Sequence, residues 1–285
     1  MITKILHALI AVLFVFPAAG LHAQETPATR TVTAGKGLQA YRETDGRAFI
    51  SILVGEYPPY VYEDTDGNWT GIEMDIARAV AGRADITLVP VIQTNWRRNL
   101  YHAERGLVGL IPSLPDTRNS HAHYHLLFRT VSLGTVLMMD KDAPPFSPAS
   151  LADLTAGNRI WGYQEGVFYG PELNEALAGD LLFAGHFEPV AGFGLNRKKL
   201  RGGRIHGYLD IGGRCGIPKH TKRIPLPFVS NADWYLAASD AVPEHLRRRM
   251  RTAAQQLEQE GELERIRKTD YCKRMRSAAA AQHIP

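Results

Sequence analysis

Three histidines at alternate positions, His121, His123 and His125, form the densest group of potential metal ligands in the chain. On a strand, a period of two would place all three imidazoles on one face, and imidazole suits zinc, nickel or copper. No acidic residue adjoins them, and a solvated histidine-rich loop is the simpler interpretation. We therefore predict neither a metal site nor a cofactor.

Three glutamates, Glu56, Glu73 and Glu165, are the carboxylates available for acid–base chemistry, which needs a pair facing one cleft. Nothing in their spacing singles out a pair. The chain also lacks the short motifs CxxC, GxGxxG, GxSxG and HExxH, which are typical of redox, nucleotide-binding and hydrolytic sites. The sequence predicts a protein that is not an enzyme.

The start of the chain differs in character from the rest. Lys4 precedes an apolar run that ends at Pro17, and small residues follow as far as Ala23. A basic start, a short apolar stretch and a small-residue cleavage site are typical of a secretory signal peptide, here residues 1–23. An uncleaved anchor is the weaker alternative, because the run is shorter than the about 20 apolar residues that span a bilayer. We predict export to the periplasm.

Export would place the two cysteines, Cys215 and Cys272, where disulfides persist. A bridge between them closes a loop of about 58 residues, worth roughly 4 kcal/mol in the chain-entropy model. Two unpaired buried thiols are the alternative interpretation.

Composition bounds the class of protein. The chain has 285 residues, 45% hydrophobic and 22% charged, which is enough for two lobes with separate cores. The net charge of +4 is too small and too dispersed to indicate a nucleic-acid partner. The basic runs at residues 197–199 and 247–249 are interpreted as solvated helix faces.

The hydrophobic pattern predicts alternating strands and helices. Strands at 48–54, 86–91 and 107–111 enclose two helices, and this βαβαβ order favours a parallel sheet flanked by helices. The pattern then repeats, with further strands expected at 133–139, 159–163, 204–210 and 229–238 and closing helices around 246–257 and 263–266.

A proline-rich corner, Glu56-Tyr57-Pro58-Pro59-Tyr60, follows the first of these strands. Proline cannot sit in a central strand, so the corner marks the end of pairing and a stiff chain holds its aromatic side chains there. Open α/β sheets bind ligands beyond the carboxyl ends of their strands. The corner is therefore a candidate wall of a binding site.

Several segments together resemble bacterial periplasmic amino-acid-binding proteins, the family 3 solute-binding proteins of ABC importers. The first-lobe signature of that family is similar to YPPYVYEDTDGNWTGIEMDIARAV, and its second-lobe entry to SLADLTAGNRIWGYQEGVFYG. Its helix-then-strand segment is similar to KKLRGGRIHGYLD, and its closing helices to WYLAASDAVPEHLRRRMRTAAQQLEQEGELERIRKTDY. The resemblance covers residues 48–275.

The resemblance implies a two-lobed α/β fold, the type II periplasmic-binding-protein fold. Two mixed sheets flanked by helices would be joined by a two-stranded hinge and close over a ligand. The expected division is a signal peptide at 1–23, a loose N-terminal arm at 24–47, lobe 1 at 48–139 with 230–273, lobe 2 at 140–229, and a disordered tail at 274–285.

In that family an arginine soon after the third strand grips the carboxylate of the ligand, and Arg118 stands at that place. A planar guanidinium pairs with a carboxylate through two parallel hydrogen bonds. Ser113 would offer its hydroxyl to the same carboxylate. The alternative for Arg118 is a surface arginine in a loop.

The resemblance also implies aromatic side chains over the ligand and an acidic group for its ammonium. Tyr57 and Trp96 match the aromatic positions, with core packing as the alternative for both. Asp210 ends the strand that carries the acidic group, although its spacing is one residue short of the common pattern. Glu56 is the second acidic candidate.

Some residues depart from the pattern. Gly109 stands where many relatives have an aspartate, Phe128-Arg129 replaces the usual Phe-Ser, and Val167 stands where a Ser or Thr is common. We expect a monomeric solute-binding protein that delivers an amino acid or related carboxylate to a membrane ABC permease. The alternatives are a periplasmic dehydratase-like enzyme on the same fold and a ligand sensor docking on a membrane receptor.

Overall fold

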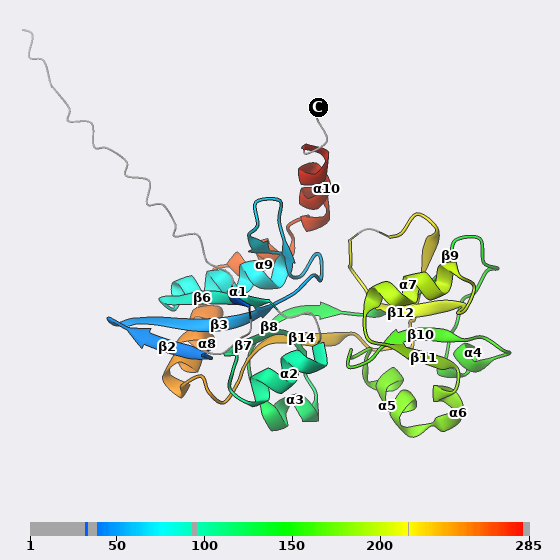
Figure 1. The fold of residues 1–285 in the computed structure, drawn as a ribbon, viewed down its shortest axis with the longest axis horizontal. Coiled ribbons are helices and arrows are strands. Elements are labelled where there is room, and N and C mark those ends of the chain that lie inside the picture. The colour runs from blue at the N-terminus through cyan, green and yellow to red at the C-terminus, as the bar shows by residue number, and fades with distance from the viewer. Residues whose placement is uncertain (1–31, 34–38, 93–95, 216, 282–285) are drawn as a thin grey trace, which may run out of the picture.

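The computed structural model describes residues 32–33, 39–92, 96–215 and 217–281, and it shows two lobes lying side by side (Figure 1). The predicted signal peptide lies outside these residues. Each lobe contains one mixed sheet with helices packed on it, and the two sheets are joined by connections between neighbouring strands. The two-lobed α/β architecture expected from the sequence is therefore confirmed.

The first lobe is built on a seven-stranded sheet of order β1-β6-β3-β7-β14-β8, with β2 pairing with β3. Strands β3, β6 and β7 are parallel, and β14 is antiparallel to both of its neighbours. The strands are β1 (Val32–Thr33), β2 (Tyr41–Thr44), β3 (Arg47–Val54), β6 (Ile86–Ile92), β7 (Leu110–Pro115), β8 (His125–Leu133) and β14 (Ala232–Ala238).

Helices cover this sheet, and the longer ones, α1 and α8, present an apolar stripe to it. The central one, α1, buries Met74, Ile76 and Val80 in the same core as Leu246 and Met250 of α8. The first-lobe helices are α1 (Ile72–Arg83), α2 (Trp96–Glu104), α3 (Arg118–His123), α8 (Glu244–Gln259) and α9 (Glu262–Arg267). A small ribbon of β4 (Tyr62–Glu63) and β5 (Trp69–Thr70) precedes α1.

The second lobe is built on a five-stranded sheet of order β11-β10-β12-β9-β13. Its strands are β9 (Thr135–Asp140), β10 (Trp161–Gln164), β11 (Phe187–Val190), β12 (Gly207–Ile211) and β13 (Thr221–Pro225). Its helices are α4 (Leu151–Thr155), α5 (Pro171–Gly179), α6 (Leu181–Ala184) and α7 (Phe193–Arg201).

The chain crosses between the lobes twice. The first crossing lies at Gly134, between β8 and β9, and the second lies between Pro225 and Ala232, between β13 and β14 (Figure 1). Gly212 donates its backbone N–H to the Gly134 carbonyl over 2.7 Å. The predicted boundary put residues up to 139 in the first lobe, whereas β9 pairs with β12 and β13 of the second sheet.

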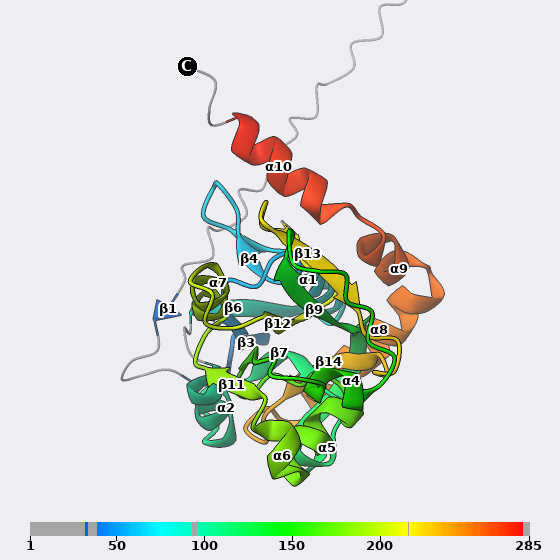
Figure 2. The same ribbon diagram turned by 90° about the vertical axis from the view of Figure 1, so that its right-hand side faces the viewer.

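Both ends of the described chain hold more secondary structure than we expected. The predicted loose arm contains β1 and β2, and β2 pairs with β3 along its full length. The predicted disordered tail begins inside a helix, α10 (Tyr271–Ala281), which points away from the body of the molecule (Figure 2). An apolar pattern is absent from both segments, so their pairing and helicity were not visible in the sequence.

A disulfide joins Cys215, which follows β12 of the second lobe, to Cys272 at the start of α10. The Cα atoms of the two cysteines are 5.3 Å apart. The neighbouring Tyr271 is buried and donates its hydroxyl to Asp75 of α1 over 2.8 Å, which fixes this end of α10 to the first lobe. The bridge is therefore a covalent link between the lobes.

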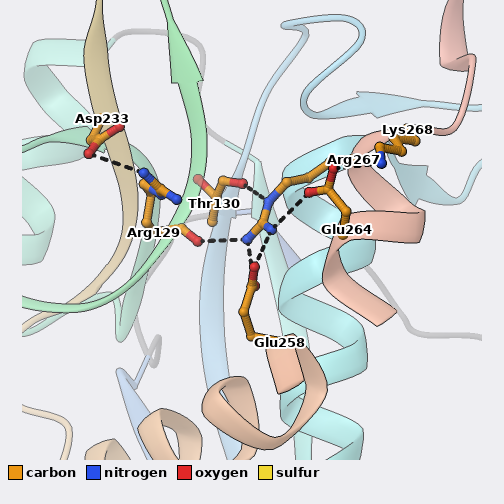
Figure 3. A network of polar contacts seen from close by, with 7 residues as sticks. All are labelled: Arg129, Thr130, Asp233, Glu258, Glu264, Arg267 and Lys268. Atoms are coloured by element: carbon orange, nitrogen blue, oxygen red, sulfur yellow. Dashed lines mark hydrogen bonds and ion pairs between the residues drawn. The ribbon is translucent and has the colours of Figure 1, made fainter. Parts of the chain in front are cut away.

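Arg267 of α9 fastens the C-terminal helices to strand β8, which leads into the hinge (Figure 3). Its Nε donates to the Thr130 carbonyl over 2.8 Å, and its two terminal nitrogens bind the Glu258 carboxylate at 2.8 and 2.9 Å. These hydrogen bonds hold the pKa of Glu258 below its usual value.

Candidate functional site

A cleft with a volume of about 510 Å³ lies between the lobes. We name its two sides by lobe. The first wall is lined by Leu53, Val54, Gly55, Glu56, Tyr57, Val61, Trp69, Ile92, Asn99, Pro112, Ser113, Pro115 and Trp234. The second wall is lined by Gln164, Gly166, Val167, Phe168, Ala191, Gly192, Gly194, Arg197 and Arg214.

The Tyr57–Tyr60 corner of the first wall is fixed tightly by its own backbone and by α1. Tyr57 donates its N–H to the Val61 carbonyl over 2.7 Å, and Ile72 at the start of α1 donates to the Pro59 carbonyl over 2.9 Å. Gly71 lies between them at φ 115°, and a Cβ there would stand 2.5 Å from the Tyr60 carbonyl oxygen. Only glycine fits such an approach, so the corner and the helix are joined rigidly.

The same corner contacts the second lobe. Tyr60 is buried and donates its hydroxyl to the Gly212 carbonyl over 2.7 Å. The Arg214 guanidinium lies over the Tyr57 ring, 4.9 Å from its centroid. Burial raises the pKa of both tyrosines above the usual range, so both hydroxyls keep their protons.

Behind the first wall lies a buried carboxyl group. Glu73 of α1 is 1% exposed, and it accepts hydrogen bonds from the backbone N–H and the hydroxyl of Ser113. The Thr130 hydroxyl lies 2.6 Å from Glu73 Oε1 and 2.9 Å from the Trp234 carbonyl oxygen. A hydroxyl has one proton and a carbonyl only accepts, so both contacts are met in full when Glu73 carries a proton. Burial raises the pKa of Glu73, which agrees with this geometry.

Ser113 itself lines the cleft and has a left-handed backbone, with φ 57°. Non-glycine residues adopt this conformation rarely, and it is retained where surrounding contacts determine it. Here the two hydrogen bonds to Glu73 supply those contacts. The carboxyl thus sets the position of a hydroxyl at the cleft surface.

The cleft surface combines aromatic rings with polar atoms that have no protein partner. Trp69, Trp234 and Phe168 line it together with Tyr57. The indole nitrogens of Trp69 and Trp234, and the amide oxygens of Asn99 and Gln164, are buried without a hydrogen-bond partner in the described structure. Mostly apolar lining with a few polar groups is typical of small-molecule sites.

The second wall supplies the positive charge. Arg197, on α7, lines the cleft and is half-buried. Arg214 lies 3.1 Å from the Asp210 carboxylate, and these two side chains are only 10% and 7% exposed. Burial raises the pKa of Tyr208 beside them, Asp210 raises it further and Arg197 opposes the shift.

The structure brings some of the predicted site residues together at the cleft. Tyr57, Glu56 and Ser113 line it. Arg118 begins α3 as an exposed side chain and is not among the lining residues. Asp210 lies behind Arg214 and does not line the cleft either. The side chain of Trp96 lies outside the described part of the structure.

Sequence reasoning missed the cations of the second wall. Arg197 belongs to a basic run that we interpreted as a solvated face, and only Lys198 is exposed in that way, since Lys199 pairs with Glu188 over 2.8 Å. The sequence did contain a signal for this wall, because Gly192 and Gly194 lie at the start of a helix that directly follows a strand. An arginine one turn later lies on the cleft side of that helix.

The groups considered for catalysis and for metal binding do not come together in the structure. Of the three glutamates weighed for catalysis, Glu56 alone lines the cleft, because Glu73 lies behind Ser113 and Glu165 is exposed elsewhere. His121 and His123 lie on helix α3, not on a strand. No group of three or more metal-ligating side chains is found in the described residues.

A family model matches most of the chain. The model of bacterial extracellular solute-binding proteins, family 3, matches residues 50–270. No curated protein matches the chain significantly.

Solved structures with the same two-lobed architecture are similar to the chain. A mutant of ArgBP from T. maritima has a TM-score of 0.61 and 16% identity, with 76% of this chain and 93% of that chain covered. An ancestral amino acid-binding protein described as a precursor of cyclohexadienyl dehydratase has a TM-score of 0.61 and 15% identity, with 76% and 92% covered. A histidine kinase sensor domain has a TM-score of 0.62 and 14% identity, with 76% and 92% covered. At these identities the likeness shows the fold.

Proposed function

The chain belongs to the bacterial extracellular solute-binding proteins of family 3, and we propose that its cleft captures an amino acid or related carboxylate for a membrane ABC importer. The observation that carries the proposal is the cleft of about 510 Å³, lined by residues of both lobes. A ligand held by both walls stabilises the closed arrangement of two lobes joined by a hinge. Binding is thereby converted into a change of shape that a transporter recognises.

The family also supports a proposed location and partner. We propose that residues 1–23 direct export and that the protein acts in the periplasm as a monomer. The Cys215–Cys272 disulfide supports this, because such bridges persist in oxidising compartments. Within the described chain, no helix is both long and apolar enough to cross a membrane. A similar structure is the substrate-binding protein of an amino acid ABC transporter.

We propose binding without catalysis. Acid–base chemistry needs two positioned groups at one cleft, and Glu56 is the single carboxylate among the lining residues described. It is exposed, and one of its oxygens accepts the Glu63 N–H over 3.1 Å. Because the fold is similar to that of a dehydratase precursor, conversion of the ligand should also be measured.

Thermal unfolding of the mature protein against a panel of amino acids, polyamines and organic acids tests the proposal. A ligand at about 100 times its dissociation constant adds roughly 2.7 kcal/mol to the unfolding free energy. Small-angle scattering with the same ligand should show a smaller radius of gyration as the lobes close. Stabilisation without compaction would contradict hinge closure, and conversion of the ligand would favour the enzyme.

Arg118→Ala is the matched control for the anchor predicted from the family resemblance. Because Arg118 is exposed and outside the lining of the cleft, we expect this variant to bind as the wild type does. A loss of binding in the variant would show that Arg118 holds the ligand as the resemblance implied.

A further inference from the structure

Within the described structure, one cation of the second wall has no acidic partner. Arg197 lines the cleft and is half-buried, and it takes part in none of the ion pairs found among the described residues. Its neighbours on α7 differ, because Lys198 is exposed and Lys199 pairs with Glu188. The position of Arg197 is therefore not explained by a structural ion pair.

The first turn of α7 opens onto the same part of the cleft. Ala191, Gly192 and Gly194 line the cleft, and Gly192 at the N-cap position provides no side-chain cap. A Cβ built on Gly192 or Gly194 would meet no atom within 4 Å, so there is open space beside the helix end. Backbone N–H groups at a helix N-terminus favour an anion.

A second, independent observation points to a ligand at this place. Gln164 ends β10, is 8% exposed and lines the cleft, and its amide oxygen has no partner in the described structure. It pairs in register with Val190, the last residue of β11 before the turn into α7. An amide turned by 180° presents its NH2 instead, so Gln164 can donate to an anion held between it and α7.

The acidic groups near the cleft are not placed to bind an ammonium group. Asp210 is 5% exposed and is not among the lining residues, and its Oδ1 accepts from Ile211 N–H over 2.9 Å and from Arg214 over 3.1 Å, so its charge is already compensated. Glu56 is exposed, and it faces the cleft from the first wall. An ammonium group buried at the second wall would therefore lack a carboxylate partner, which is costly.

We propose that the cleft anchors its ligand by a carboxylate held on Arg197 and the first turn of α7, and that this ligand lacks an α-ammonium group. The inference rests on the proposed function and narrows its ligand class. The apolar body of the ligand lies against Tyr57, Trp69, Phe168 and Trp234, which line the rest of the cleft. The expected ligand is a small carboxylate with an apolar, planar body.

Matched probe pairs test the ligand class. Calorimetric titration of the mature protein compares 3-phenylpropionate with phenylalanine, and 4-methylpentanoate with leucine, which differ only in the ammonium group. We expect each carboxylate to bind at least about tenfold more tightly than its amino acid, because an uncompensated ammonium is buried in the latter. Tighter binding of the amino acids overturns the inference and leaves the proposed function standing. Absence of binding by every probe overturns both.

Two matched variants test the anchor. Arg197→Gln should weaken binding of the tightest carboxylate probe by at least about tenfold, the value of a charge-assisted hydrogen bond. Lys198→Gln removes the same charge from the exposed side of the same helix and should change binding less than about twofold. Equal effects in the two variants would overturn the anchor.

A substitution at the helix end separates folding from binding. Gly192→Asp and Gly192→Asn both provide a favourable N-cap in open space, so both should fold. The aspartate adds a negative charge beside Arg197, so the aspartate variant should bind the carboxylate about tenfold more weakly than the asparagine variant. Equal affinities for the two variants would contradict a carboxylate at this position.

Discussion

The first wall of the cleft is packed against its own backbone, whereas the second wall leaves space beside its glycines. A Cβ at Gly71 would stand 2.5 Å from a carbonyl oxygen of the corner, while Gly192 and Gly194 have no atom within 4 Å of theirs. The ionisable groups differ in the same way, because the first wall buries Glu73 behind a hydroxyl and the second presents Arg197 to the cleft. The comparison indicates that one wall fixes a shape and the other selects a ligand.

The largest expected effect contrasts one substitution in the two walls. Gly71→Ala should cost more than about 4 kcal/mol of unfolding free energy, because it forces a Cβ into backbone at φ 115°. Gly194→Ala, at a helical position with open space, should instead add about 0.5–1 kcal/mol. Urea unfolding of both variants measures the difference. Similar values would show that the two walls are equally packed.

The disulfide links the two lobes that supply the two walls of the cleft. Replacing Cys215 and Cys272 together by alanine should cost about 4 kcal/mol, because the bridge closes a loop of roughly 58 residues in the unfolded chain. Urea unfolding of the double variant measures this cost. A loss below about 1 kcal/mol would show that the contacts of Tyr271 alone secure α10.

Buried charge in the second wall is tested by Asp210→Ala. Removing the carboxylate leaves Arg214 buried beside Tyr57, and we expect a loss of about 3 kcal/mol. Glu188→Ala is the control within the same lobe, since its pair with Lys199 is partly exposed and is worth at most about 1 kcal/mol. If both variants lose the same amount, Arg214 finds another partner or water.

The buried carboxyl group of the first wall is tested by pH. Burial raises the pKa of Glu73, so above 4.5 the folded protein still holds a proton that the unfolded chain has released. The wild-type unfolding free energy therefore falls as pH rises through the folded pKa. Glu73→Gln lacks this dependence, and its stability relative to wild type should rise between about pH 4 and pH 8. The opposite trend would show an ionised, stabilised carboxylate.

The fold was predictable because its helices and strands are determined by residues that are close together in the sequence. Apolar runs such as 48–54, the proline corner at 56–60 and the helix that follows are decided by neighbouring residues, and the structure confirms the two lobes they indicated. The boundary at Gly134 was missed because the single strand predicted at 133–139 includes the end of β8 and most of β9. Their assignment to different sheets depends on partners far away in the chain.

The site was predictable only where the chain itself shapes it. Tyr57 follows β3 in the proline corner, Ser113 lies within β7, and both residues line the cleft. Arg118 and Arg197 have the same chemistry in the sequence, and burial distinguishes them in the structure, which no local pattern records. The neutralisation of Asp210 depends on Arg214 four residues later, beyond a glycine turn whose direction the sequence does not specify.

The insertion of β14 between β7 and β8 has a consequence for synthesis. This inner strand of the first sheet is encoded after the whole of the second lobe, so β7 and β8 emerge with unpaired edges. The second sheet is continuous in the chain and is complete while the first is still open. Exposed edges of this kind invite pairing with other chains. A newly made chain is thus exposed to such pairing until about its last fifth has been synthesised, when β14 and the helices beyond it close the first lobe.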